Sequence, residues 1–282
     1  MENILYLINE KYDNLSKMHK KLADYILNNS EKAILMPISE LAEESTVSEA
    51  TIVRFTYKLG YSGYKEFQKA LLDSIKYSLT TIQRLDVSKD LSDNKLIHSQ
   101  VNSDVNDINT TFSQLDPKVI IDAAKLIDES DRIFIFGLRT SNLLAQYLAQ
   151  YLRMMGFDIV LVEATRMEPF EYLVNMTEDD LLLCLSFPRY SQRTIQCIKS
   201  IYDKGYKIIS ITDSETSPVY KFSKISLIAR SSMNSFFDSL VSPLVLVNTL
   251  LQALSVVTKR NVKASFTALE EFWEKNSTYE KI

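Results

Sequence analysis

Apolar side chains recur at helical spacing through the first 77 residues of the chain. In the first clear helix they share one face, at Leu15, Met18, Leu22, Tyr25 and Ile26. A short helix near residues 31–35 is expected to stop before Pro37, because proline lacks the backbone N–H that a helix needs. Ile38, Leu41 and Ala42 then predict a helix of about two turns. The pattern indicates an all-helical bundle.

A tight turn joins this last helix to another. The segment "ISELAEES" supplies the first helix, "TV" the turn and "SEATIVRFTYKL" the second. Ser48 can cap the second helix by accepting a backbone N–H bond, and Gly60 can end it in a left-handed conformation. Its inward stripe is expected to be Ile52, Phe55 and Leu59. A further helix is predicted from Tyr64 to Tyr77, through Phe67, Leu71, Leu72 and Ile75.

Residues 78–115 form a polar segment rich in Asp, Asn and Ser. Its widely spaced apolar positions fit one long helix and are Ile97, Val101, Val105, Ile108 and Phe112. We expect this segment to connect a helical domain of residues 1–77 to a second domain of residues 116–282.

From residue 118 onward, short apolar runs alternate with helical segments. The runs are "RIFIFG", "FDIVLVE", "DLLLCLSF", "KIISITD" and "KISLIAR", and helical segments such as "SNLLAQYLAQYLRMM" lie between them. Strands that are covered on both faces show such continuous apolar runs. The alternation therefore predicts βαβ units and an α/β domain with a parallel sheet flanked by helices.

Composition narrows the class of protein. With 282 residues, 46% of them hydrophobic, the chain can hold one large domain or two of ordinary size. Charges interrupt the apolar start "MENILYLINEKYDNL", which argues against a signal peptide. The most apolar segment, residues 240–257, carries Ser242, Pro243, Asn248 and other polar groups, so a buried or subunit-interface helix is favoured over a membrane span.

Cysteine and histidine are scarce. Cys184 and Cys197 belong to no CxxC or Cys/His cluster, which argues against structural zinc and for a reducing cytoplasm. Both histidines, His19 and His98, lie in the first third, so a histidine-based catalytic site is excluded from the second domain. We expect neither a metal nor a cofactor.

Basic side chains gather around the second helix of the tight pair, although the chain has a net charge of −4. With Ile52 and Phe55 facing inward, Thr51, Arg54 and Lys58 are expected on an outward stripe. In helix–turn–helix proteins the second helix of such a pair enters the DNA major groove.

The side chains on and beside this stripe suit DNA. Arg54 suits guanine or phosphate, Lys58 and Lys65 suit phosphate, and Thr51 suits either a base or a phosphate. The helix start at Ser48 can also receive a phosphate. The competing interpretation is an ordinary bundle with a basic solvated face, because residues 1–77 hold 10 Lys or Arg against 11 Asp or Glu.

The segment "ISELAEESTVSEATIVRFTYKLGYSGYKEFQKAL" closely resembles the N-terminal domain of the RpiR/MurR family of bacterial transcriptional regulators. The match follows the series LA, VS, AT, VRF, KLG, G and EF. The resemblance implies a DNA-binding helix–turn–helix domain and a dimer or tetramer that reads operator DNA.

Polar residues follow three of the predicted strands. They occur in "FGLRTS", "LSFPRYSQRT" and "ITDSETS", the last with Thr212, Asp213, Ser214 and Ser217. Ligands of open parallel sheets bind beyond the carboxyl ends of the strands, and hydroxyls at helix starts suit a phosphate. The alternative is that Ser and Thr serve there only as helix caps.

Residues 115–255 resemble the sugar isomerase (SIS) domain, which is the partner domain in the same regulator family. Members carry Gly-x-Gly-x-Ser after the first strand and Ser-x-Ser-Gly-x-Thr after a later one. By that match Ser141, Ser186 and Ser191 are expected to contact the phosphate of a phosphosugar. The candidate ligand site as a whole comprises Arg139, Thr140, Ser141, Ser186, Arg189, Ser191 and Thr194.

Three positions depart from the family pattern. Arg139 and Arg189 stand where glycine is usual, and Pro188 replaces a serine. Two arginines at an anion site suit a carboxylate or phosphate, so the effector is predicted to be more acidic than a simple phosphosugar. Alternatively, the arginines pair with Glu163, Glu168 or Glu171 and narrow the pocket.

The rival function is a sugar-phosphate isomerase. That reaction needs a positioned base, and no feature of the sequence singles out one glutamate for the role. We therefore expect a non-enzymatic, cytoplasmic regulator of carbohydrate metabolism whose partners are operator DNA, an anionic sugar and a second copy of the chain. The helix at residues 240–257 is a candidate subunit contact, with burial inside one subunit as the alternative.

Overall fold

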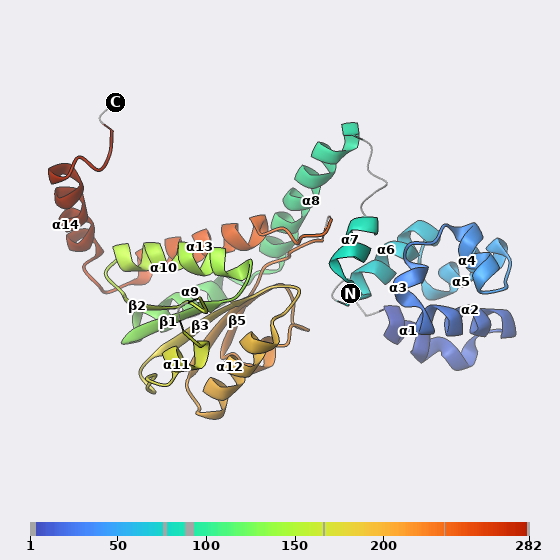
Figure 1. Ribbon diagram of the computed structural model, residues 1–282, viewed down its shortest axis with the longest axis horizontal. Coiled ribbons are helices and arrows are strands. Elements are labelled where there is room, and N and C mark those ends of the chain that lie inside the picture. The colour runs from blue at the N-terminus through green and yellow to red at the C-terminus, as the bar shows by residue number, and fades with distance from the viewer. Residues whose placement is uncertain (1–3, 76–77, 88–92, 166, 234, 281–282) are drawn as a thin grey trace. The chain divides into compact units, whose positions relative to one another are not determined.

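The chain folds into two units, drawn in Figure 1 from a computed structural model that describes residues 4–75, 78–87, 93–165, 167–233 and 235–280. One unit comprises residues 1–96 with 233–238, and the other comprises residues 97–232 with 239–282. The predicted connector, residues 78–115, is shared between them. The domain boundaries at residues 77 and 116 stay a prediction.

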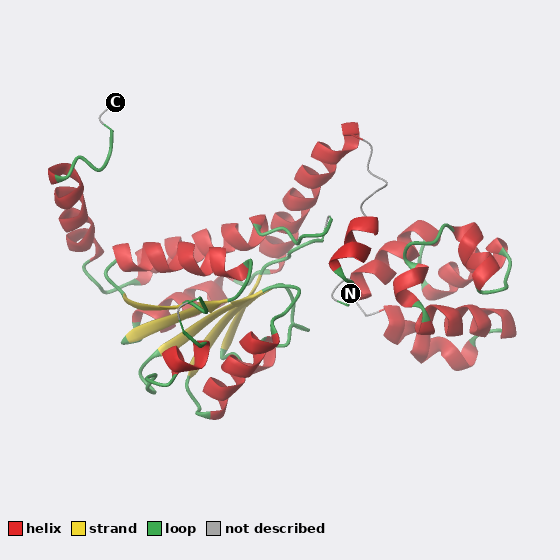
Figure 2. Cartoon of the chain, viewed as in Figure 1, coloured by secondary structure: helices red, strands yellow, loops and turns green. Residues whose placement is uncertain are grey.

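The first unit is built from helices (Figure 2). They are α1 (Ile4–Lys11), the 3-10 helix η1 (Tyr12–Asn14), α2 (Lys17–Asn28), α3 (Ser30–Ala33), α4 (Ile38–Glu44), α5 (Glu49–Leu59), α6 (Tyr64–Ile75) and α7 (Thr81–Val87). Their apolar faces meet in one core that includes Leu22, Ile26, Leu41, Phe55 and Phe67. The helical bundle predicted from the spacing is confirmed.

A short segment from late in the sequence belongs to this unit. Residues 233–238 lie with the helices, and Met233 packs against their core. Arg84 of α7, whose side chain is 2% exposed, donates from Nη1 to Asp238 Oδ2 over 2.6 Å. A buried arginine is tolerated only when a carboxylate compensates its charge, so this ion pair fixes the segment on α7.

The second unit contains a five-stranded parallel sheet with strand order β2-β1-β3-β4-β5. The strands are β1 (Arg132–Gly137), β2 (Asp158–Val162), β3 (Leu181–Ser186), β4 (Lys207–Thr212) and β5 (Ile225–Ile228). Each corresponds to one of the apolar runs, so the predicted α/β fold is confirmed. The order reverses between β1 and β3, and ligands of open parallel sheets generally bind beyond the carboxyl ends of the strands at such a point.

Helices cover both faces of the sheet (Figure 1). The helices α9 (Pro117–Asp128), α10 (Ser141–Met154) and α13 (Val241–Val257) pack on one face, against Ile133, Ile135 and other inward residues. The helices α11 (Pro169–Leu173) and α12 (Gln192–Asp203) pack on the other, against Phe134 and Phe136. Alternate strand residues point to opposite faces, which is why each run had to be apolar throughout.

Helices α8 (Asp93–Gln114) and α13 confirm two further sequence predictions. The first is the long helix predicted in the connector. The second prediction concerned α13, which was expected to be buried or to lie at a subunit interface. Its residues Leu246, Leu250 and Leu254 are buried within this chain against α9 and α10. A subunit contact by its remaining face stays a prediction.

Helix α14 (Val262–Lys275) follows α13, and none of its residues is buried. No single helix in the described part of the chain is long and apolar enough to cross a membrane, and α13 and α14 meet that test only as a pair bent by 112°.

Candidate DNA-binding helix and ligand site

Local signals set both ends of α5. The hydroxyl of Ser48 accepts a hydrogen bond from the backbone N–H of Thr51 over 3.2 Å, which caps the helix start. Gly60 ends the helix with φ at 99°, in the left-handed region that side chains other than glycine rarely adopt. Both features were predicted. Ile52, Phe55 and Leu59 are buried as expected, so the opposite face of α5 is turned to solvent.

Arg54 and Lys58 lie on the exposed face of α5, and Lys65 is exposed in the first turn of α6. The Lys58 ammonium also donates to the backbone carbonyl of Asn14 over 2.5 Å, which ties α5 to η1. The structure thus presents three cations and the helix start at Ser48 on the surface, as the DNA-binding interpretation requires.

The expectation that Thr51 projects outward is wrong. Its side chain is only 8% exposed, and its hydroxyl lies 2.8 Å from that of Ser48. Thr51 is four residues before Phe55, so it lies at the edge of the buried stripe and not on the Arg54 stripe. Its hydroxyl supports the start of the helix.

Sequence reasoning missed three residues of the exposed face. Ala50 and Tyr57 are exposed and Val53 is half-buried, and they flank Arg54. Ala50 and Tyr57 lie four and three residues from Arg54, which is the helical spacing that could have identified them, whereas Val53 is the residue directly before Arg54 and carries no such signal. Small and aromatic side chains beside an arginine offer apolar contact to a base edge as well as charge.

His19 of α2 packs behind α5. Its ring meets that of Phe55 edge to face, with centroids 5.5 Å apart. Burial lowers the pKa of His19, and the nearby Lys58 and Arg54 charges lower it further, while a hydrogen bond to the Thr51 backbone opposes the shift. The imidazole is therefore held neutral beneath the basic face.

The candidate ligand edge lies where β1 and β3 end side by side. A side chain at Gly137 would put its Cβ 2.7 Å from the Ser141 carbonyl oxygen, so only glycine allows α10 to start so close to β1. The Ser141 hydroxyl then accepts a hydrogen bond from the Phe187 backbone N–H over 3.3 Å. Ser141 and Ser186 are both 4% exposed. The two loops predicted to share a site are therefore in contact.

The third polar loop, after β4, joins this edge. Thr212 donates its hydroxyl proton to the Ser186 carbonyl oxygen over 2.7 Å, and the Ser217 hydroxyl lies 2.7 Å from that of Thr212. Tyr190 donates to Asp213 Oδ1 over 2.6 Å. Burial raises the pKa of Tyr190, and the Asp213 carboxylate raises it further, so the phenol stays protonated. The edge thus contains a buried carboxylate that sequence reasoning left out of the site.

The remaining candidate residues occupy the same edge. Thr140 and Ser191 are the cap positions of α10 and α12, and neither side chain makes a capping hydrogen bond. Thr194 is buried in the first turn of α12. The interpretation of these hydroxyls as helix caps alone is therefore not supported at Thr140 and Ser191.

Both unusual arginines are exposed at this edge. Arg139 has φ at 56°, in the left-handed region where the family pattern has glycine. An arginine in that conformation costs about 1–2 kcal/mol relative to glycine. The alternative interpretation paired the two arginines with glutamates of the same domain. One of these glutamates, Glu168, forms its ion pair with Arg193 over 3.2 Å.

Comparisons with known proteins agree with this architecture. Residues 2–78 match the model of the helix-turn-helix domain of the rpiR family, and residues 125–253 match that of the SIS domain. An HTH-type transcriptional regulator from Haemophilus influenzae is 30% identical over 234 residues, which cover 80% of this chain and 79% of the relative. Another from Clostridium perfringens is 29% identical over 80% of this chain and 81% of the relative.

A solved structure shows the same fold along nearly the whole chain. It is the Vibrio vulnificus NanR protein complexed with ManNAc-6P, with a TM-score of 0.57 and 24% identity, covering 97% of this chain and 98% of that one. Taken with the family matches, the tight helix pair and the parallel sheet with its polar edge, this places the chain in the RpiR family of HTH-type transcriptional regulators, with an N-terminal helix–turn–helix domain and a C-terminal SIS domain.

Proposed function

We propose that this regulator binds operator DNA through α4 and α5, and that an anionic sugar bound at the SIS edge controls the affinity for DNA. The observation that carries the proposal is the presence, in one chain, of an exposed basic recognition helix and a sheet edge with buried hydroxyls from β1 and β3 loops. In this assignment Arg54 contacts base edges or phosphate, and Ser48, Lys58 and Lys65 contact phosphates.

The effector is a phosphosugar or a more acidic sugar derivative. Ser141, Ser186 and Ser191, with the backbone N–H groups at the starts of α10 and α12, supply hydrogen-bond donors for a phosphate. The solved NanR structure holds ManNAc-6P, which supports this ligand class. The Asp213 carboxylate would repel a bare anion, and Arg139 and Arg189 offset that repulsion.

Hydrogen bonds continue from this edge to the connector helix. Ala229 donates its backbone N–H to the Thr212 carbonyl oxygen, and Arg230 donates its own to the Thr111 hydroxyl of α8, over 2.8 and 2.9 Å. Asp107 of α8, 4% exposed, accepts from the Ser232 N–H and hydroxyl over 2.8 and 2.7 Å. This connection supports transmission of effector binding to α8.

Control then follows from linkage. An effector that binds the DNA-competent and DNA-incompetent arrangements with different affinity must shift the equilibrium between them, and DNA must alter the effector affinity by the same factor. Helix–turn–helix proteins usually read paired half-sites, so the acting species is at least a dimer, and it acts in the cytoplasm.

The test is a titration of the full-length protein into labelled DNA from its own promoter region at fixed salt. A panel of sugar phosphates, with and without an additional carboxylate, is added at saturating concentration. We expect one class to change the dissociation constant for DNA and to raise the melting temperature of the protein. Stabilisation by neutral, unphosphorylated sugars alone would refute the anion site. Turnover of any sugar phosphate would refute the non-enzymatic role.

A further inference from the structure

The basic side chains of the helical unit are concentrated in two segments of the chain. Residues 14–23 and 50–65 hold six of the ten Lys and Arg of residues 1–77 and none of the eleven Asp and Glu. The six are Lys17, Lys20, Lys21, Arg54, Lys58 and Lys65. The near balance of charge over residues 1–77 therefore contains two purely basic segments, and only the second of them belongs to the helix–turn–helix.

The structure packs these two segments against each other. The Lys58 ammonium of α5 donates to the backbone carbonyl of Asn14, two residues before the Ser16 cap of α2, over 2.5 Å. Further along α2, the His19 ring meets the Phe55 ring of α5 edge to face. The first turns of α2 therefore lie beside the recognition helix, although Asn14 and Lys58 are 44 positions apart in the sequence.

The three lysines of α2 have no carboxylate partner that explains them. Lys17 and Lys21 are exposed, and Lys20 is half-buried over the Tyr12 ring, 5.2 Å from its centroid. Asp24, one turn after Lys20, accepts a hydrogen bond from the Tyr12 hydroxyl over 2.6 Å. Within the described residues none of the three lysines forms an ion pair.

Helix stability does not explain these charges either. Lys17 is in the first turn of α2, where the partial positive charge of the helix end disfavours a cation, and that turn has no acidic residue to offset it. The Lys58 and Arg54 charges already lower the pKa of His19 beyond the effect of its burial, so α2 borders a positive region. Like charges that repel one another destabilise a compact unit.

Duplex DNA is the anion that offsets this repulsion. It carries one negative charge for about every 1.7 Å of its axis, in a regular array along both edges of each groove. In the proposed function α5 enters the major groove, so the phosphates bordering that groove are the anions that the neighbouring α2 meets.

We propose that Lys17, Lys20 and Lys21 of α2 contact the phosphate backbone bordering the groove that α5 enters. Since α2 lies outside the helix–turn–helix pair of α4 and α5, it is a second DNA-contacting element. Phosphate contacts carry no sequence information, but they add affinity and fix the orientation of the protein on the duplex. This inference rests on the proposed function in taking duplex DNA as the partner.

The experiment measures DNA affinity of the full-length protein by fluorescence anisotropy over a salt series. The probes are a duplex from its own promoter region and an unrelated duplex of equal length. Lys17→Gln, Lys20→Gln and Lys21→Gln should each weaken binding to both duplexes about threefold, and the triple variant on the order of twentyfold. The triple variant should also lower the slope of log affinity against log salt by about 2.7 per bound subunit, at about 0.9 for each lost phosphate contact.

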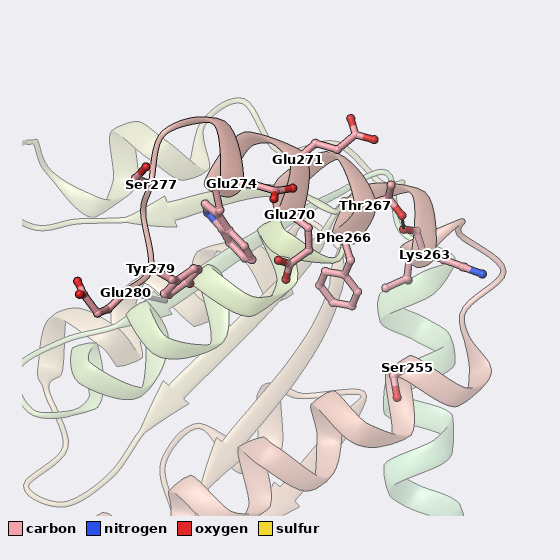
Figure 3. A pocket seen from close by; sticks show the side chains of 12 residues that line it. Ser255, Lys263, Phe266, Thr267, Glu270, Glu271, Glu274, Ser277, Tyr279 and Glu280 are labelled. Atoms are coloured by element: carbon pink, nitrogen blue, oxygen red, sulfur yellow. Dashed lines mark hydrogen bonds between the residues drawn. The ribbon is translucent and has the colours of Figure 1, made fainter. Parts of the chain in front are cut away.

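Two control proteins separate charge at this surface from other effects. Replacement of the same three lysines by arginine keeps the charges and should keep the affinity. Lys263→Gln is the matched control, because Lys263 is exposed in the first turn of α14 as Lys17 is in that of α2. It lines a groove of about 770 Å³ together with Glu270, Glu271 and Glu274 (Figure 3), so it should not contribute to binding of a polyanion.

The outcomes distinguish this inference from the proposed function. Unchanged affinity and salt slope in the glutamine triple variant, beside weaker binding by Arg54→Ala, would overturn the inference and leave the proposed function standing. Weaker binding of the triple variant to both duplexes, with no preference of the wild type for the promoter duplex, would support the α2 contact and refute operator recognition. Equal losses in the arginine and glutamine triple variants would overturn the phosphate contact, and a wild type that binds neither duplex would overturn both proposals.

Discussion

The backbone N–H of Phe187, directly after β3, donates a hydrogen bond to the hydroxyl of Ser141, which starts α10 after β1. This single bond joins the two loops at the point where the strand order reverses. It uses the Ser141 oxygen as an acceptor and leaves the hydroxyl proton available to donate to a bound anion.

Ser141→Ala should therefore weaken effector binding and also lower the free energy of unfolding by about 1–3 kcal/mol, because the buried Phe187 N–H loses its partner. The measurement is effector titration by calorimetry beside thermal unfolding. Ser210→Ala is the control, since Ser210 is fully buried on β4 and bonds Ser226 away from this edge. It should lose stability and keep effector affinity. Equal affinity loss in both variants would show that the effect is not local.

Arg139→Gly should separate stability from binding. Glycine relieves a left-handed backbone strain of about 1–2 kcal/mol, partly offset by the greater freedom of glycine in the unfolded chain. We expect the melting temperature to hold or rise while affinity for an acidic effector falls. Arg153→Gly, in the last turn of helix α10, is the control. It should lower the melting temperature and leave the affinity for the effector unchanged. An Arg139→Gly protein that binds the effector unchanged would show that the arginine does not contact it.

Arg54→Ala should weaken binding to operator DNA by about 1–3 kcal/mol and relax the preference for one base pair. Lys58→Ala should weaken binding to all sequences alike and reduce the slope of affinity against salt by about one unit. Both are measured by fluorescence anisotropy over a salt series. Lys32→Ala, at an exposed lysine of α3, is the control that should change neither. Wild-type affinity of the Arg54 variant at matched salt would refute the groove assignment.

The helical unit should lose stability as the pH falls below about 6.5, the ordinary pKa of histidine. The pKa of His19 is lowered in the folded state, so the unfolded chain binds its proton first and unfolding becomes easier. The loss, at most about 1.4 kcal/mol per pH unit, grows as pH falls towards the folded-state pKa. Amide exchange in α5, corrected for intrinsic rates, should show this, and His19→Gln should abolish it. His98→Gln should leave it unchanged.

Asp107→Asn should uncouple effector from DNA. The amide retains the shape of the side chain but has one acceptor oxygen for the two donors of Ser232. We expect effector affinity and basal DNA affinity to stay within about twofold of wild type, while the effector-induced change in DNA affinity shrinks. The comparison needs both titrations on one protein preparation. A full effector response in this variant would show that α8 is not the transmitting element.

The sequence by itself determined the element types and their order. Helical spacing through Ile52, Phe55 and Leu59, the Ser48 cap and the Gly60 stop are local signals, because each acts within one or two helical turns. The apolar runs equally determined a parallel sheet covered on both faces. The residues that follow the strands could also be chosen from the sequence as candidates for one site, because the carboxyl ends of parallel strands lie at the same edge of the sheet.

Only the tertiary structure decided how individual side chains are used. Thr51 is buried because it lies beside the buried stripe that contains Phe55. Helical periodicity alone cannot predict whether a residue at the boundary between the buried and exposed faces is buried. The hydrogen bond from Tyr190 to Asp213 joins two loops that are distant in the sequence. The left-handed backbone of Arg139 has no local sequence signal, because arginine rarely adopts that conformation. Val262 and Leu269 of α14 illustrate the same limit: periodicity predicts an apolar face, whereas contacts across the whole fold leave both side chains half-buried.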